Sequence, residues 1–297
     1  MEYNSETMPF MEHHFFDGKC LIPGAVLCDT MIQAVTMLDS TEQTFPIHVH
    51  SLEIYRAIHI AAKEAYGITL HVNRQNDDKY SIEMRGDIKN SKGKVVRKNV
   101  LITDATVSLG ASNEPMPEEE QNKTIVHYSV GTDEFYRYFI RTHRELFQTL
   151  TGELSLNEDD SWTRTTFNIH DKESRFSEMS KYPFLISPLG LDSVLQTAVS
   201  FSVLSANPDG DYIYTKLPVG MRDLILYKPF EFSKIYKCSV HCLDSTQETL
   251  TLKIFIHNES DEVIGGIDKV FLKQAPFERY DTGGPSKHIE KFIVTEG

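Results

Sequence analysis

The sequence predicts an α+β fold in which one largely buried helix and several long antiparallel strands occur twice. Each half contains a mostly apolar segment that follows a proline, and segments of alternating apolar and polar residues come after it. The chain has 297 residues, of which 40% are hydrophobic and 25% charged, so it can build a sizeable core. We expect a curved sheet wrapped around a helix, present in duplicate.

The first helix is expected over residues 24–38, directly after Pro23. Its apolar residues recur at helical spacing, which predicts a face buried against a sheet. Strands are expected after it, because apolar and polar residues alternate there between turns that contain glycine or asparagine. These strands cover residues 49–60, 66–73, 80–89 and 94–109.

The second helix is expected over residues 189–204, after Pro188, and most of its positions are apolar. One alternating segment precedes it and several follow it, which predicts further strands. The two halves are alike in this arrangement, whereas their residues show no strong similarity. The strands of the second half cover residues 163–169, 216–227, 233–243, 249–257 and 263–272.

Residues 110–124 differ from the rest of the chain in composition. They include two prolines and three consecutive glutamates with almost no apolar side chains, which is typical of a solvated linker. We therefore expect an N-terminal half at residues 1–110, a linker at 111–124 and a C-terminal half at 125–297. Both halves fall within the usual range of domain sizes.

The charge and cysteine content exclude several classes of protein. The chain has 43 acidic and 30 basic residues, a net charge of −13, and such a surface repels phosphate backbones and anionic lipids. We therefore expect neither a nucleic-acid nor a membrane partner. No apolar run reaches the roughly 20 residues of a membrane span, and the first residues lack the pattern of a secretory signal. Four cysteines without a CxxC pair predict free thiols in a cytoplasmic protein.

His14 is the first candidate for chemistry. It precedes Gly18, and then Pro23 and Gly24 at the start of the first predicted helix. Unpaired N–H groups at a helix N-terminus can polarise a carbonyl oxygen, and a nearby imidazole can remove a proton alpha to that carbonyl. On spacing alone, the favoured interpretation is a structural histidine that is partly buried between aromatic side chains.

Asp192 and Gln196 are the second candidates, in the first turn of the second predicted helix and four residues later. This spacing places both side chains on one face, where the amide can hydrogen-bond the carboxyl. Apolar neighbours predict a desolvated carboxyl with a raised pKa, able to hold a proton near neutrality. The alternative is an aspartate at the helix start that only stabilises the helix dipole.

Three short sequence motifs occur in order along the chain. His14 to Pro23 matches H-x-x-x-G-x-x-x-x-P, and Pro188 to Gln196 matches P-x-x-x-D-x-x-x-Q. The pair Leu217-Pro218 resembles a Leu-Pro strand motif. Together they resemble dehydratase domains of modular polyketide synthases over nearly the whole chain. This order favours the chemical interpretation of His14 and of the aspartate over the structural alternatives.

The resemblance implies a double-hotdog fold, with a curved antiparallel sheet around a long central helix in each half. It implies loss of water from a β-hydroxyacyl thioester on an acyl carrier protein. His14 would take the α-proton, Asp192 would protonate the leaving hydroxyl, and Gln196 would orient the aspartate. Backbone N–H groups near the start of the first helix would hold the thioester carbonyl. The implied substrate-binding positions are Gly18, Pro23, Gly24, His143, Phe147, Pro188, Leu217 and Pro218.

One motif departs from the family. Its members commonly carry G-Y-x-Y-G-P-x-F, whereas residues 140–147 read IRTHRELF. Phe147 is kept, and His143 stands where the second tyrosine is usual. We expect His143 to donate a hydrogen bond near the substrate hydroxyl and to tune selectivity. The charged neighbours favour an alternative, in which the segment is a solvated helix face.

The resemblance also implies partners: a carrier protein bearing phosphopantetheine, neighbouring synthase domains and a second copy in a homodimer. No cofactor is expected, because nucleotide-binding motifs are absent from the sequence. His48 and His50 alternate on a strand, but no third ligand is near in sequence, so no metal site is expected.

Two alternatives keep the fold. One is a double-bond-shifting isomerase or a cyclising enzyme of pyran-forming or product-template type. The other is a non-catalytic scaffold domain. Isomerases of this family typically lose the helix aspartate or the motif proline, so the retained Asp192, Gln196 and Pro23 favour dehydration.

Overall fold

The computed structural model describes most of the chain, in fourteen segments. These are residues 2–4, 6–16, 19–38, 45–60, 64–76, 78–90, 93–110, 126–138, 142–157, 162–169, 184–205, 212–231, 234–281 and 290–291. The predicted linker at 111–124 and Gly18 lie outside them. No helix within these segments is long and apolar enough to cross a membrane.

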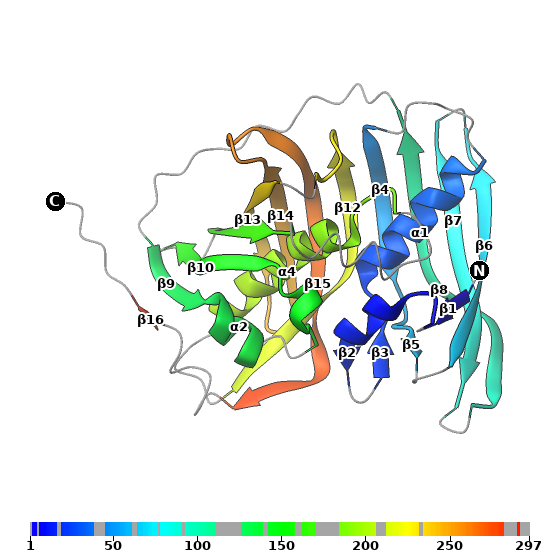
Figure 1. Ribbon diagram of the computed structural model, residues 1–297, viewed down its shortest axis with the longest axis horizontal. Helices are drawn as coiled ribbons and strands as arrows, with labels where there is room; N and C mark the ends of the chain where they lie inside the picture. The colour runs from blue at the N-terminus through cyan, green and yellow to red at the C-terminus, as the bar shows by residue number, and fades with distance from the viewer. Residues whose placement is uncertain are drawn as a thin grey trace.

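One long antiparallel sheet of thirteen strands dominates the described structure (Figure 1). A second sheet has three short strands, β2 (Phe15–Phe16), β3 (Lys19–Leu21) and β5 (His59–Ile60). The long sheet runs in the order β1 (Glu2–Asn4), β6 (Ala65–Arg74), β7 (Tyr80–Lys89), β8 (Val95–Leu109), β4 (Ile47–Ile54), β12 (Tyr212–Leu226), β15 (Val263–Asp281), β14 (Thr249–His257), β13 (Ile235–Ser245), β11 (Trp162–Asn168), β10 (Leu150–Asn157), β9 (Val126–Gly131) and β16 (Glu290–Lys291).

The two halves of the chain meet at β4 and β12, which pair in antiparallel register from Gly220 opposite Glu53 to Leu226 opposite Ile47. This pairing makes one continuous sheet from strands that precede and follow the predicted linker. The two predicted units therefore share a sheet rather than only packing against each other.

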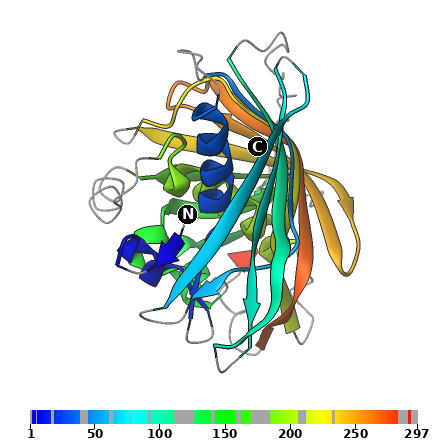
Figure 2. The same cartoon turned by 90° about the vertical axis from the view of Figure 1, so that its right-hand side faces the viewer.

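Two helices, α1 (Gly24–Thr36) and α4 (Pro188–Leu204), lie on the same side of the long sheet (Figure 1). Figure 2 shows the strands twisting and curving around the face that carries these helices. α1 packs on β6, β7 and β8, α4 packs on β10 to β14, and the two helices contact each other. All 17 residues of α4 are buried, including polar side chains such as those of Asp192 and Gln196.

Local sequence explains where each helix begins. Pro23 caps α1 in an extended conformation, and Pro188 occupies the first position of α4. The hydroxyl of Ser187 accepts a hydrogen bond from the Gly190 N–H at 3.0 Å, which satisfies one free donor of the first turn. A Cβ at Gly190 would lie 2.7 Å from the Phe230 ring, so only glycine permits this close packing.

The remaining helices are short: α2 (Thr132–Tyr138) and the 3-10 turns η1 (Pro9–His13) and η2 (Glu145–Phe147). The sequence did not predict them, nor the strands β1, β2, β3, β9, β10 and β16. The strand expected at 49–60 is interrupted and forms β4 and β5. The other predicted strands and both long helices are present, with ends displaced by a few residues, except that β15 extends to Asp281.

Candidate active site

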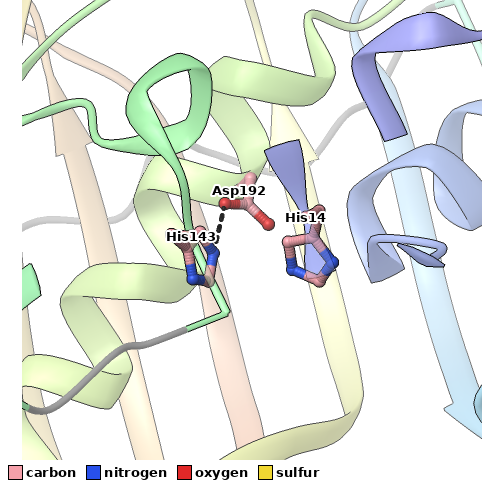
Figure 3. A group of neighbouring side chains, drawn as sticks. All are labelled: His14, His143 and Asp192. Atoms are coloured by element: carbon pink, nitrogen blue, oxygen red, sulfur yellow. Dashed lines mark hydrogen bonds and ion pairs between the residues drawn. The ribbon is translucent and has the colours of Figure 1, made fainter. Parts of the chain in front are cut away.

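His14 and His143 lie opposite each other in an isolated antiparallel bridge. Beside the bridge, the Phe15 N–H donates to the carbonyl of Thr142 at 2.8 Å. Directly opposed residues of an antiparallel pair project their side chains from the same face. The two imidazole rings accordingly meet, with centroids 4.8 Å apart and planes at 87° (Figure 3).

The orientation of the His14 ring is fixed by Leu21. Nδ1 lies 2.8 Å from the Leu21 carbonyl oxygen, which can only accept, so Nδ1 carries the proton and Nε2 keeps a lone pair. The side chain is buried, at 7% exposure. Two effects lower the pKa of His14 to about 4: burial is the larger, and the charge of the neighbouring His143 is the second. His14 is therefore a neutral imidazole near neutral pH, with its single ring proton on Nδ1.

Asp192 lies in the second turn of α4, not in the first turn as predicted. Its Oδ2 atom is 3.1 Å from Nε2 of His143 and accepts the Gln196 amide at 2.6 Å. The other carboxylate oxygen points toward His14 (Figure 3). Ligand atoms of the two histidines and the aspartate all lie within 4.8 Å of one another.

The raised pKa predicted for Asp192 is wrong. Burial does raise it, but the charge of His143 and the hydrogen bond from His143 lower it further, so the net shift of the Asp192 pKa is downward. Sequence neighbours alone indicated desolvation. They did not reveal the imidazole that offsets the desolvation.

His143 is not part of a solvated helix face. Its side chain is only 10% exposed, and its Nδ1 lies 2.9 Å from the Thr142 hydroxyl. Its carbonyl accepts a hydrogen bond from the Gln148 amide at 3.0 Å. Backbone pairing with the His14 segment therefore directs the ring inward, toward Asp192.

Gln196 holds the aspartate in place through a chain of buried groups. Its amide donates to Asp192 and, at 2.8 Å, to the carbonyl of Phe147. Its side-chain oxygen accepts from the hydroxyl of Tyr136 at 2.6 Å, and this hydroxyl accepts the Leu150 N–H at 2.9 Å. Sequence reasoning missed Tyr136, because it lies on the short helix α2 with no recognisable spacing to Gln196.

The first helix has its own aspartate and glutamine pair at the same spacing. Asp29 accepts the backbone N–H groups of Leu185 at 2.9 Å and Ile186 at 2.7 Å, and Gln33 donates to it at 2.5 Å. Burial raises the pKa of Asp29 to about 6. This contact attaches α1 to the segment that enters α4. The D-x-x-x-Q pattern in both helices was a sequence signal that could have been found.

The structure brings together some of the predicted substrate-binding residues and leaves others apart. The Phe147 ring lies 5.4 Å from that of His14 and 6.1 Å from that of His143, measured between centroids. Pro23, Gly24 and Pro188 stand at the helix starts. Leu217 and Pro218 lie half-buried in β12, outside the hydrogen-bonded cluster around Asp192.

His48 and His50 do have a third neighbour, which the sequence prediction missed. Asp223 of β12 lies 3.0 Å from Nε2 of His48 and 4.0 Å from Nδ1 of His50, and the hydroxyl of Ser108 lies 2.9 Å from Nε2 of His50. We name His48, His50 and Asp223 the seam cluster, since it spans β4 and β12. All four cysteines are free thiols.

The geometry combines a neutral imidazole with an ionised carboxylate that is hydrogen-bonded to a second imidazole. All three side chains are nearly buried. The unprotonated Nε2 of His14 can accept a proton, and the Asp192–His143 pair can share one. Such a site suits acid–base chemistry in which one group takes a proton while another delivers one.

Comparison with known proteins adds a shared fold. No protein-family model and no curated protein sequence matches the chain. Among solved structures, a trans-AT polyketide synthase dehydratase domain from Brevibacillus brevis is 13% identical, with a TM-score of 0.72 over 93% of this chain and 92% of that one. The dehydratase domain from the CurF module of curacin polyketide synthase is 16% identical, with a TM-score of 0.71 over 92% of both chains.

The dehydratase domain of PpsC from Mycobacterium tuberculosis, in complex with C12:1-CoA, is 15% identical, with a TM-score of 0.68 over 92% of both chains. These similarities cover almost the entire chain, and the arrangement of sheet and helices is that of a hotdog fold. The likeness predicted from the motifs is thus confirmed for the fold: the chain is folded like the dehydratase domains of polyketide synthases.

Proposed function

We propose that this protein is a β-hydroxyacyl thioester dehydratase of polyketide biosynthesis. One observation carries the proposal: His14, from the first half, and Asp192 with Gln196, from the second, converge at one nearly buried site. The shared fold with polyketide synthase dehydratase domains supports the reaction class. An inactive histidine-to-phenylalanine mutant of the CurJ dehydratase is consistent with an essential histidine in such domains.

In the proposed reaction, Nε2 of His14 takes the α-proton of the substrate. The C–H electron pair forms the α,β double bond, and the β-hydroxyl leaves with a proton as water. Because the pKa of Asp192 is lowered beside His143, the proton donor is the hydrogen-bonded Asp192–His143 pair rather than an isolated carboxylic acid. Gln196 is a positioning residue that orients the carboxylate.

We further propose a double-hotdog architecture, with the halves at 1–110 and 125–297. The support is that α1 and α4 each pack on their own group of strands, and that both start at a proline. The remaining predicted substrate-binding residues, including Gly18, stay part of this proposal. Phe147 lies in ring contact with both histidines, so it is the best placed to contact the acyl chain.

The proposed substrate is carried by the phosphopantetheine of an acyl carrier protein, beside neighbouring synthase domains. A net charge of −13 offers no electrostatic attraction to an acidic carrier, so covalent tethering would supply the encounter rate. A cytoplasmic location and a homodimer remain predictions, and sedimentation equilibrium checks the second.

The test is direct. The purified chain is incubated with a 3-hydroxyacyl pantetheine thioester, and products are followed by mass spectrometry. Loss of one water per substrate, slowed by about 100-fold or more in His14→Ala and kept in the exposed-surface control His71→Ala, supports dehydration. No loss of water from this substrate, together with double-bond migration in a 2-enoyl thioester supplied separately, would favour the isomerase. Absence of turnover with both thioesters would favour the scaffold.

A further inference from the structure

We propose that His14, His143 and Asp192 also form a binding site for a zinc-like divalent metal ion, with a fourth coordination position left open. The set contains two imidazoles and one carboxylate, which are common zinc ligands. One ligand atom from each residue lies within 4.8 Å of the other two. His143 is the residue that departs from the dehydratase motif, and it supplies the third ligand.

The spacing of the two rings is compatible with tetrahedral coordination of one ion. With a zinc–nitrogen bond of about 2.0–2.1 Å, the centres of two ligating imidazoles stand roughly 5 Å apart. The rings of His14 and His143 have centroids 4.8 Å apart and planes at 87°. The distance of 3.1 Å between His143 Nε2 and Asp192 Oδ2 is also close to the spacing of two neighbouring zinc ligands, about 3.3 Å.

Each proposed ligand makes a further hydrogen bond that orients its side chain, as metal ligands usually do. His14 donates its Nδ1–H to the Leu21 carbonyl, which leaves Nε2 free toward the site. His143 contacts the Thr142 hydroxyl through Nδ1, which leaves Nε2 toward Asp192. The Gln196 amide fixes the carboxylate. The three ligand atoms are thereby oriented without a metal being needed to arrange them.

Metal binding would move one proton within the His143 ring. In the metal-free protein the Nε2–H of His143 donates to the Asp192 carboxylate, and a metal ion takes the place of this hydrogen. This proton moves to Nδ1 of the same neutral ring, where the Thr142 hydroxyl can accept it, and Nε2 then offers its lone pair as Nε2 of His14 already does.

The seam cluster is the rival metal site in the described part of the chain, and its geometry is poorer. The rings of His48 and His50 have centroids 3.6 Å apart and planes tilted by 36°, which is closer than the roughly 5 Å between the centres of two imidazoles that bind one zinc ion. Lys79 also adds positive charge beside His50. These features make the seam cluster a matched control rather than the preferred site.

The consequence for activity rests on the proposed function. If Nε2 of His14 is the general base, a bound metal ion occupies its lone pair and inhibits dehydration until a chelator removes the ion. Metal binding itself does not depend on the dehydratase proposal. The two can therefore fail separately in the experiment.

The experiment titrates metal-free protein with Co²⁺, whose visible absorption reports four-coordinate binding, and then displaces it with Zn²⁺. The wild type should bind one ion per chain. His143→Gln should bind at least about 10- to 100-fold more weakly, since even partners of a metal ligand change affinity on this scale. The control, the double variant His48→Gln/His50→Gln, should bind like the wild type. Circular dichroism checks that each variant is folded.

The ion is also located in wild-type crystals by anomalous diffraction at the zinc edge, which needs no variant. A peak between His14, His143 and Asp192 supports the proposal, whereas a peak at the seam cluster, or no binding to the wild type, overturns it. Dehydration by protein that binds no cobalt refutes the metal site alone. Cobalt binding by protein that never dehydrates a thioester refutes the proposed function alone.

Discussion

His14 and His143 are neighbours across a single backbone bridge, although they lie on opposite sides of the predicted linker. Their rings meet edge to face at 4.8 Å, and His143 in turn contacts Asp192 at 3.1 Å. The base proposed for the reaction is therefore coupled electrostatically to the carboxylate pair that would deliver the proton. This coupling leads to specific expectations for each residue.

Replacing His14 by alanine should lower turnover by about 100-fold or more, because it removes the general base. The substitution leaves its backbone bridge in place, so the fold should survive. Turnover is measured with a 3-hydroxyacyl thioester, and folding by circular dichroism. Near-native turnover in a folded His14→Ala protein would remove this residue from the mechanism.

On the acidic side of the pH profile, activity should fall only at a low pH. Because burial and then His143 lower the pKa of His14 to about 4, this base stays unprotonated until the pH approaches that value. We expect kcat/KM to stay level down to about pH 5 and to fall below it. In His143→Gln this fall should move up toward the ordinary histidine pKa of about 6.5. If kcat/KM falls at the same pH in the wild type and in His143→Gln, the electrostatic coupling between His143 and His14 is contradicted.

His143 should matter through its hydrogen bond to Asp192. His143→Ala leaves the carboxylate without this partner and should cost about 1–2 kcal/mol of transition-state stabilisation, or about 5- to 30-fold in kcat/KM. His143→Tyr restores a donor at the position and should preserve dehydration. The prediction fails if alanine and tyrosine give equal rates.

Tyr136 should act as a positioning residue. Its hydroxyl donates to Gln196, which donates to Asp192, so Tyr136→Phe loosens the carboxylate without touching substrate. We expect kcat to fall about tenfold, equivalent to about 1.4 kcal/mol, with KM nearly unchanged. Tyr3→Phe is the matched control, because Tyr3 is also buried and its hydroxyl donates to Thr30 outside the site. Both variants should lose about 1 kcal/mol of stability, and a matching loss of kcat in Tyr3→Phe would disprove the assignment.

Asp29 should make stability depend on pH. Since its pKa is raised to about 6 in the folded protein, the folded state holds this proton more tightly than the unfolded chain does. The stabilisation is full below about pH 4 and is lost as the pH rises through about 6.

The test variant is Asp29→Asn, which keeps an oxygen for the N–H groups of Leu185 and Ile186 and cannot ionise. It should remove about 3 kcal/mol of the pH dependence of the unfolding free energy between about pH 4 and 7. Denaturant unfolding at each pH measures it, with the exposed Asp78→Asn as the control. An unchanged pH dependence in Asp29→Asn would show that another group is responsible.

Much of the fold was readable from local pattern. Apolar residues at helical spacing gave α1 and α4, alternation gave most strands of the long sheet, and prolines marked both helix starts. The contact between Asp192 and Gln196 also followed from spacing, because residues four apart on a helix share a face. The short strands β2 and β3 were missed, since two or three residues carry no measurable periodicity.

The sequence by itself determined which residues could take part in chemistry: an imidazole before a helix start, and a carboxylate and amide on one helix face. Only the tertiary structure decided how they behave. His143 reaches Asp192 because two distant segments form one bridge, and its charge reverses the pKa shift that burial alone would give. The same kind of long-range contact places Asp223 beside His48 and His50. It also brings the hydroxyl of Tyr136 to the side-chain oxygen of Gln196. Electrostatic and hydrogen-bond energies depend on distances in space, and the spacing of residues along a chain sets those distances only within a single helix or strand.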